Sequence, residues 1–136
     1  MNTRVTPSNI TSLLPHEVFV FGSNLSGIHG KGAAKTALGW GAKWGQGAGI
    51  QGKTYGIPTK GKSVYQVLQI HQIKPFVDEF IEWAKYHKGN VFYVTEIGCG
   101  LAGYSPKDIA PLFEKAIEAE NIYLPAKFWH KLKTKE

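Results

Sequence analysis

The stretch NVFYVTEIGCGLAGYSPKD, residues 90–108, passes from a strand pattern through a glycine-rich loop to the start of a helix. Its first part, NVFYVT, is apolar, β-branched and aromatic, which is typical of a buried strand. At its end, Ser105 suits the N-cap of a helix, Pro106 suits the first helical position, and Asp108 completes a capping box. The stretch therefore predicts a strand, a loop and a helix in direct succession.

The rest of the chain repeats this order of strand and helix. Apolar side chains recur at three- and four-residue steps from Ile70 to Ala84, which predicts an amphipathic helix that ends at KGN, residues 88–90. Pro58 lies near the end of the strand pattern TYGIPT, so we expect a sheet edge or a bulge there. Further strands are predicted over EVFVFGS from Glu17 and NIYLP from Asn121, with a short helix from Ala33 to Gly39 and a helix after Ser105 that turns Ile109, Ala110, Leu112, Phe113, Ala116 and Ile117 to the core.

Strands that are separated by helices need crossover connections, which favour a largely parallel sheet with helices on its faces. A chain of 136 residues fits one domain and buries enough surface to fold without disulfides or a metal. We therefore predict a single α/β domain over residues 1–136, with a three-layer α/β/α fold and a mostly parallel mixed sheet. Residues 127–136 are expected to form a basic C-terminal tail.

Cysteine and histidine usage gives no sign of a metal site. Cys99 is the only cysteine, and the five histidines are scattered without zinc-binding spacing, so we expect no metal and no cofactor. No stretch approaches the roughly 20 apolar residues of a membrane span, and the N-terminus lacks the apolar core of a signal peptide. We expect a soluble, cytoplasmic protein with no membrane partner.

The formal net charge of +6 favours anionic partners such as nucleic acid, nucleotides or phosphates. Part of this charge lies in KFWHKLKTKE, residues 127–136, which holds four lysines in ten residues. This segment is interpreted as a solvated, partly frayed tail, and the alternative is a contact with nucleic acid.

Two glycine-rich segments follow predicted strands. We call GSNLSGIHGKGAA, residues 22–34, the first glycine loop, and GCGLAGYS, residues 98–105, the second glycine loop. Ligands of open α/β sheets lie beyond the carboxyl ends of the strands, and glycine lets backbone N–H groups approach a ligand closely. Side by side, the two loops could hold a pyrophosphate between them. The alternative is that their glycines only form tight turns.

Motif matching alone does not identify the ligand. G-x-G-x-x-G occurs at residues 98–103, but the dinucleotide-binding version follows the first strand and needs an acidic residue about twenty positions later. Neither loop matches the P-loop pattern.

The two loops together resemble a family. FGSNLSGIHGKGAAKTALGWG, residues 21–41, followed by IGCGLAGYS, residues 97–105, is similar to the macro domain, an α/β module that binds ADP-ribose. The similarity is closest to the branch of terminal ADP-ribose protein glycohydrolases, whose I-G-C-G-L pattern occurs here at residues 97–101. The resemblance implies binding of ADP-ribose or a related nucleotide diphosphate, free or attached to a protein or nucleic acid.

Several residues match positions that contact the ligand in this family. The resemblance implies that Asn24 touches the distal ribose, although an Asx turn would explain the same residue. Tyr104 borders the distal ribose or is a half-buried core tyrosine, and Cys99 contributes its backbone rather than a nucleophilic sulfur. The implied ligand-binding residues are Gly22, Ser23, Asn24, Gly30, Lys31, Gly32, Ala33, Gly98, Cys99, Gly100, Leu101, Ala102, Gly103 and Tyr104.

The resemblance is incomplete at the catalytic positions. Lys60, at the end of TYGIPTK, matches the lysine that attacks the anomeric carbon in the glycohydrolase branch, but Ala102 stands where that branch has an aspartate. A lysine that is not desolvated stays protonated, so Lys60 is interpreted as a phosphate-contacting or solvated cation. We expect binding without strong catalysis. The alternatives are an ADP-ribosyl glycohydrolase that uses Lys60 and a basic nucleic-acid-binding protein.

Recognition of adenine is not explained by the resemblance. Macro domains often hold the adenine amine with an acidic residue near an early strand, and no acidic residue precedes Glu17 here. Aromatic stacking by Trp40, Trp44 or Tyr55 could replace it. Trp40 and Trp44 would share a face on a helix, for which core packing is the commoner reason.

Overall fold

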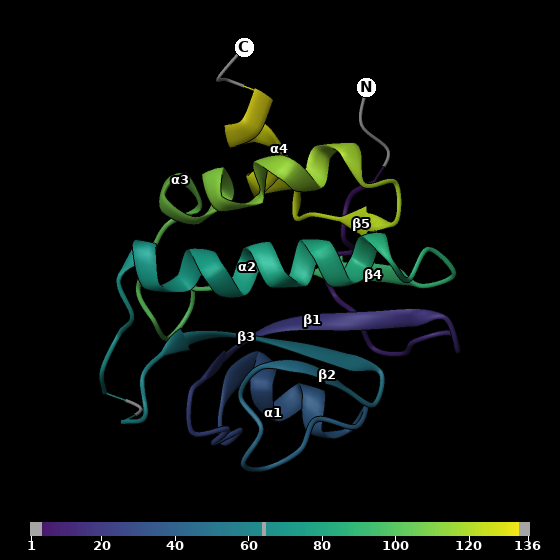
Figure 1. Cartoon of the computed structure of the whole chain (residues 1–136). Helices are drawn as coiled ribbons and strands as arrows, with labels where there is room; N and C mark the ends of the chain where they lie inside the picture. Colours follow the sequence, from purple (N-terminus) through teal and green to yellow (C-terminus); the bar gives the residue numbers. More distant parts are fainter. Residues whose placement is uncertain (1–3, 64, 134–136) are drawn as a thin grey trace.

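Five strands form one mixed sheet in the order β2-β3-β1-β4-β5 (Figure 1). The computed structural model describes residues 4–63 and 65–133. The strands are β1 (Glu17–Asn24), β2 (Gly49–Gln51), β3 (Thr54–Lys60), β4 (Val91–Val94) and β5 (Ile122–Tyr123). The helices are α1 (Gly32–Leu38), α2 (Ile70–Lys85), α3 (Pro106–Ile109), the 3-10 helix η1 (Ala110–Glu118) and α4 (Ala126–Lys133).

The sheet is mostly parallel. Strand β1 pairs in parallel with β3 and β4, β4 pairs in parallel with β5, and only β2 runs antiparallel, against β3. These pairings confirm the predicted α/β class. Strand β2 was not predicted, because its three residues lie in a glycine-rich segment without a strand pattern.

Helices cover both faces of the sheet, and the side chains of β1 alternate between the two resulting cores. Val18 and Val20 belong to the larger core, which includes residues of α2, η1 and α4. Phe19 and Phe21 point to the opposite face and pack in the smaller core with Ala34 and other residues of and around α1. Figure 1 shows this division, with α1 below the sheet and the other helices above it.

Pro58 lies at an irregularity in the pairing of β1 with β3, as predicted. Ser23 is opposite Pro58, but Asn24 is opposite Lys60, so β3 contains one extra residue at this point. The pairing of β2 with β3 reaches only to Gly56, so it does not require an N–H group from the proline.

The capping box at Ser105 is present, but the helix it starts changes type. The backbone N–H of Ser105 donates to the Asp108 carboxylate at 3.0 Å. After one α-helical turn the chain continues as the 3-10 helix η1, with Pro111 near its start. The expected burial of Ile117 was wrong, since 40% of this residue is exposed.

The C-terminal segment is a packed helix as far as the structure describes it. Helix α4 buries Phe128, Trp129 and Leu132 in the larger core, so the interpretation of residues 127–133 as a solvated tail was wrong. Residues 134–136 lie outside the described residues. The apolar side chains at a spacing of one, three and four explain the burial.

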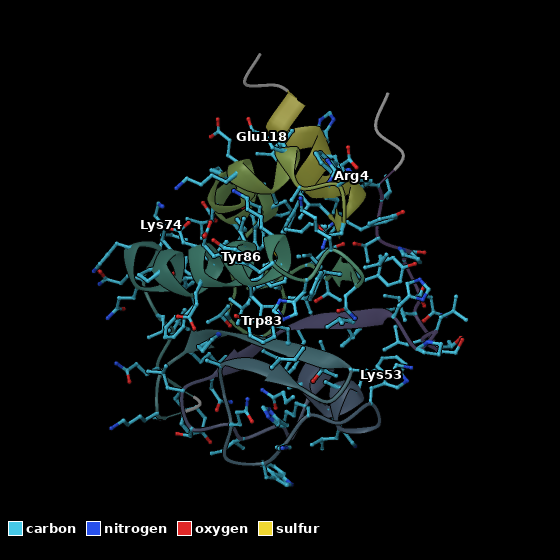
Figure 2. The ribbon with its side chains drawn as sticks, turned by 45° about the vertical axis from the view of Figure 1, so that its right-hand side comes forward. Arg4, Lys53, Lys74, Trp83, Tyr86 and Glu118 are labelled. Carbon is cyan, nitrogen blue, oxygen red and sulfur yellow. The ribbon has the colours of Figure 1, made fainter. Side chains whose placement is uncertain are left out.

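Arg4 fixes the N-terminal segment to η1 and α4 (Figure 2). Its guanidinium donates hydrogen bonds to the carbonyl oxygens of Ala119 and Ile122 near the C-terminus of η1, where a cation is favourable. The guanidinium carbon also lies 5.2 Å from the centre of a Trp129 ring, and the Trp129 indole N–H donates to the Arg4 carbonyl at 2.6 Å. Among the described residues no helix is both long and apolar enough to cross a membrane.

Candidate functional site

The carboxyl ends of β1, β3 and β4 lie at the same edge of the sheet. Asn24 is opposite Lys60 at the ends of β1 and β3, and Val20 is opposite Val94 in β4. Because these strands are parallel and adjacent, the chain leaves all three at this edge. The first glycine loop therefore begins beside the segment that leads into the second glycine loop.

The two glycine loops approach each other at two places. A Cβ atom at Gly22 would lie 3.5 Å from the backbone nitrogen of Gly98, which is ordinary van der Waals contact. Further along, a Cβ atom at Gly32 would lie 3.8 Å from Cδ1 of Leu101. The start of α1 and the middle of the second glycine loop thus lie side by side.

The first glycine loop is shaped from within by Asn24. The side-chain Oδ1 of Asn24 accepts the N–H of Ile28, and its Nδ2 donates to the carbonyl oxygen of Ile28, both at 2.8 Å. Asn24 is 6% exposed. Its amide is therefore occupied by the loop, although it pairs with the backbone four residues on and not two residues on as in an Asx turn.

Residues 45–47 support the first glycine loop from outside, a role that the sequence pattern did not reveal. The N–H of Gly45 donates to the carbonyl oxygen of Gly27 at 3.0 Å, and the Ser23 hydroxyl donates to the carbonyl oxygen of Gly47. A Cβ atom at Gly47 would lie only 2.0 Å from the carbonyl oxygen of Asn24, so a side chain would separate the two segments. The high glycine content of residues 39–61 was the available signal.

The second glycine loop turns at Gly98, whose φ of +76° is a conformation that favours glycine. The N–H of Tyr104 closes the loop by donating to the Gly98 carbonyl oxygen at 2.8 Å. Gly100 and Leu101 are exposed, and their N–H groups have no hydrogen-bond partner among the described residues. These two N–H groups are free to bind an acceptor from solution.

The start of α1 also has unpaired donors. Lys31 is the N-cap residue and gives no side-chain cap, so the N–H groups of Gly32 and Ala33 have no partner within the helix. Lys31 and Gly32 are exposed. Donors from α1 and from the second glycine loop thus lie on both sides of the contact between Gly32 and Leu101.

The charge of both loops is positive or neutral. Lys31 is their only charged residue, and neither loop contains an aspartate or glutamate. Glu96, just before the second glycine loop, lies 3.7 Å from the ammonium of Lys127, which offsets its charge. An anion between the loops would meet no carboxylate from either loop.

Tyr104 and Cys99 occupy structural positions in the second glycine loop. Tyr104 packs against the larger core, and its hydroxyl donates to the carbonyl oxygen of Leu68 at 2.5 Å. Burial, with smaller contributions from Glu96 and Asp108, raises the pKa of the Cys99 thiol to about 11. The thiol is therefore protonated near neutral pH, which argues against a nucleophilic role.

Lys60 ends β3 beside the first glycine loop. Its carbonyl oxygen accepts the N–H of Leu25 at 3.0 Å, and its backbone forms an isolated bridge with Val67. Its side chain is half-buried. The backbone of Lys60 is therefore fixed next to Asn24, at the edge where the two loops meet.

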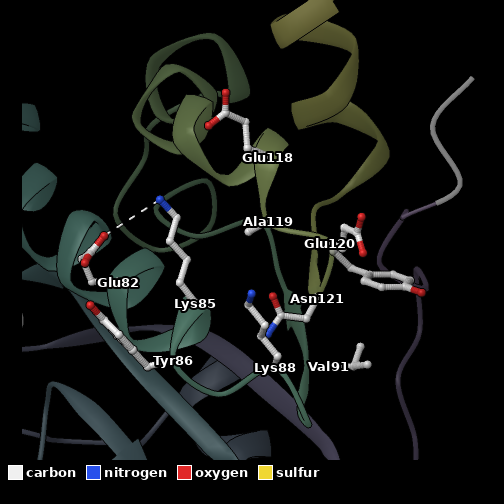
Figure 3. Close-up of a pocket in the computed structure, with 10 residues that line it drawn as sticks. Glu82, Lys85, Tyr86, Lys88, Val91, Glu118, Ala119, Glu120 and Asn121 are labelled. Carbon is white, nitrogen blue, oxygen red and sulfur yellow. Dashed lines mark ion pairs between the residues drawn. The ribbon is translucent and has the colours of Figure 1, made fainter.

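A separate hollow of about 820 Å³ lies at the opposite edge of the sheet, near the first residue of β4 and the C-termini of α2 and η1 (Figure 3). Charges of both signs line it, and Lys85 pairs with Glu82 at 3.9 Å. The hollow is lined by none of the residues of the glycine loops. We place the candidate site at the loops, because unpaired N–H donors gather there without carboxylates.

Within residues 4–63 and 65–133, no three histidine, cysteine, aspartate or glutamate side chains are grouped so that they could hold a metal ion. Comparisons with protein-family models, with curated proteins and with solved structures gave no match.

Proposed function

We propose that the chain binds ADP-ribose, or a related nucleotide diphosphate, between the two glycine loops, without strong catalysis. The observation that carries this proposal is the close approach of Gly22 to Gly98 and of Gly32 to Leu101. A diphosphate is short and doubly charged, and it needs several N–H donors from two directions. The paired loops offer such donors.

The resemblance of the two loops to those of macro domains supports the same ligand. The similarity rests on residues 21–41 and 97–105, which are far apart in sequence and adjacent in the fold. The unpaired N–H donors of the two loops lie on both sides of the contact between Gly32 and Leu101, which favours a ligand role for the loops over a role in chain reversal alone.

Hydrolysis of an ADP-ribosyl bond through Lys60 is the second candidate function. It is favoured by one observation, the position of Lys60 opposite Asn24 at the candidate site. Against it, neither loop supplies a carboxylate to assist a lysine nucleophile. We therefore propose Lys60 as a cation that contacts the phosphates.

Titration calorimetry with ADP-ribose, AMP and ribose 5-phosphate tests binding of the diphosphate. We expect binding of ADP-ribose, and binding at least tenfold weaker for the two monophosphates. Lys31→Glu places a carboxylate at the start of α1, where it is favourable for the helix but repels an anion. This variant should fold normally and lose affinity for ADP-ribose by about tenfold or more, which is about 1.4 kcal/mol.

Lys88→Glu is the matched control, because it makes the same change of charge at the opposite edge of the sheet. It should bind ADP-ribose as the unmodified chain does. No heat with ADP-ribose at millimolar concentration would refute the proposal. Release of ADP-ribose from a modified protein, with the release lost in Lys60→Ala, would replace it with the hydrolase.

A further inference from the structure

Trp44 is largely exposed to solvent, and one face of its ring packs on another side chain. It is 62% exposed, although tryptophan is a large apolar residue. Its ring is stacked on that of His29, with 6.0 Å between the ring centroids and 18° between the planes. The inner face of the indole therefore lies on His29, and much of the remaining surface of Trp44 is open to solvent.

His29 is itself fixed in place. The residue is fully buried, and its Nε2 forms a hydrogen bond of 3.0 Å with the carbonyl oxygen of Gln46, in which the imidazole must donate. The ring also meets Phe21 edge-on, with centroids 5.4 Å apart and an interplanar angle of 82°. Trp44 thus rests on a support that is anchored in the smaller core.

One ring nitrogen of His29 is buried unfavourably. Nδ1 of His29 is buried and has no hydrogen-bond partner among the described residues. A buried polar atom without a partner lowers stability, and an apolar side chain of similar size would avoid this. The flat imidazole does what a branched aliphatic side chain does not, because it presents a planar surface to the indole of Trp44.

Trp44 borders the candidate site. A Cβ atom at Gly30 would lie 4.0 Å from Cη2 of Trp44, and Gly32, two residues later, approaches Leu101 in the second glycine loop. Two residues of chain span at most about 7 Å. The indole and the contact between the two loops therefore lie on neighbouring parts of the first glycine loop.

The other two aromatic candidates do not offer such a surface. Tyr55 is 3% exposed and lies in the larger core. Trp40 packs on Phe19, with ring centroids 5.0 Å apart. Trp40 and Trp44 both follow α1, which ends at Leu38, so they do not share a helix face as the sequence suggested.

We propose that the exposed face of Trp44 stacks on the purine base of the bound nucleotide, which would explain base recognition without an acidic residue. This inference rests on the proposed function, since the loops must hold the diphosphate of the same ligand. A rigid aromatic face is suited to this task, because every base has a π-face and little conformational freedom is lost. His29 acts as a positioning residue for the indole.

The test compares a ligand with a base and one without. Calorimetry with ADP-ribose and with ribose 5-diphosphate, the latter by displacement if its heat is small, measures the contribution of the base. Trp44→Ala should weaken the binding of ADP-ribose by roughly tenfold, within the range known for loss of one stacked base. The same variant should leave the affinity for ribose 5-diphosphate unchanged. Trp44→Phe should retain most of the affinity for ADP-ribose.

Tyr86→Ala is the matched control, because Tyr86 is also an exposed aromatic residue, 82% exposed, and lies at the opposite edge of the sheet. It should bind both ligands normally. Equal affinity of Trp44→Ala and the unmodified chain for ADP-ribose would overturn the stacking but leave the proposed function intact. If Trp44→Ala weakened the binding of both ligands equally, the stacking would also be overturned, since Trp44 would then act through the shape of the loop. Failure of the unmodified chain to bind either ligand would refute both proposals.

Discussion

Asn24 holds the first glycine loop closed by pairing with both backbone polar groups of Ile28. The amide oxygen of Asn24 accepts the Ile28 N–H, and the amide nitrogen donates to the Ile28 carbonyl oxygen, each at 2.8 Å. Only an amide side chain supplies a donor and an acceptor in this arrangement. The asparagine thus fixes the path of the first glycine loop between residues 24 and 28.

Asn24→Ala should lower the free energy of unfolding by about 1–3 kcal/mol, because two partly buried hydrogen bonds are lost and Asn24 leaves a gap in the loop. Asn24→Asp keeps the acceptor for the Ile28 N–H but puts a charged carboxylate oxygen against the Ile28 carbonyl oxygen at a buried position, so its loss near neutral pH should be at least as large. Urea denaturation monitored by tryptophan fluorescence measures both values. An Asn24→Ala variant of unchanged stability that binds ADP-ribose more weakly would indicate that the amide serves the ligand instead.

The regular elements could be predicted because their signal is local. Val18 to Phe21 alternate between two cores, and the stripe from Ile70 to Ala84 fixes the buried face of α2. Ile117 was misplaced for a physical reason. Pro111 lies near the start of a 3-10 helix, whose three residues per turn shift later side chains from the faces that an α-helix would give them.

The candidate site could be predicted only in part. The order of strand, glycine loop and helix placed the two loops at strand ends, which fixed their common edge. The support of Asn24 by Gly47 and the stacking of Trp44 on His29 are contacts between segments without a repeating pattern. Such contacts depend on the folded path of residues 39–49, and no spacing in the sequence encodes them.

Gly98 and Gly100 should respond differently to the same substitution. Gly98 has a φ of +76°, and a Cβ atom there would lie 3.0 Å from Cδ1 of Ile109. The left-handed backbone conformation alone should therefore lower the free energy of unfolding of Gly98→Ala by about 1–2 kcal/mol. A Cβ atom at Gly100 would meet no described atom within 4 Å, so Gly100→Ala should change the free energy of unfolding by less than about 1 kcal/mol.

Thermal and urea unfolding of the two glycine variants, measured side by side, check this contrast. Both glycines lie in the same loop and share its neighbouring sequence, while Gly98 is buried and Gly100 is exposed. Equal destabilisation of the two variants would contradict the assigned turn at Gly98.

Cys99 should react slowly with alkylating reagents near neutral pH. Burial raises its thiol pKa to about 11, so at pH 8 only about one molecule in a thousand carries the thiolate. The rate of modification by iodoacetamide should be on the order of a hundredfold below that of free cysteine and should rise about tenfold per pH unit up to pH 9. Mass spectrometry measures this rate without ambiguity, because Cys99 is the only cysteine.

A rate that levels off near pH 8 would contradict the raised pKa and return Cys99 to consideration as a nucleophile. Cys99→Ser serves as a second measurement. If only the backbone of residue 99 contributes to the site, this variant should bind ADP-ribose as the unmodified chain does.

Glu17 should make folding stability sensitive to acid. Its carboxylate accepts the backbone N–H of Leu14 and the hydroxyl of Tyr93, both at 2.7 Å, and the bond from Leu14 is the largest cause of its lowered pKa. Because the folded pKa lies below the ordinary value of 4.5, the carboxylate contributes its full stabilisation above pH 4.5. Below that value the unfolded chain takes up the proton first, and the contribution is lost as the pH falls through the folded pKa.

Urea denaturation at pH 7, 5, 4 and 3 should therefore show a smaller loss of stability on acidification for Glu17→Gln than for the unmodified chain. Glutamine keeps an oxygen for the Leu14 N–H but has no proton to gain in this range. Glu79→Gln removes an exposed carboxylate of α2 and is the matched control for the change in net charge. Glu17→Gln and the unmodified chain would lose stability in parallel between pH 5 and 3 if the two hydrogen bonds did not favour the ionised carboxylate, and this result would refute the role of Glu17.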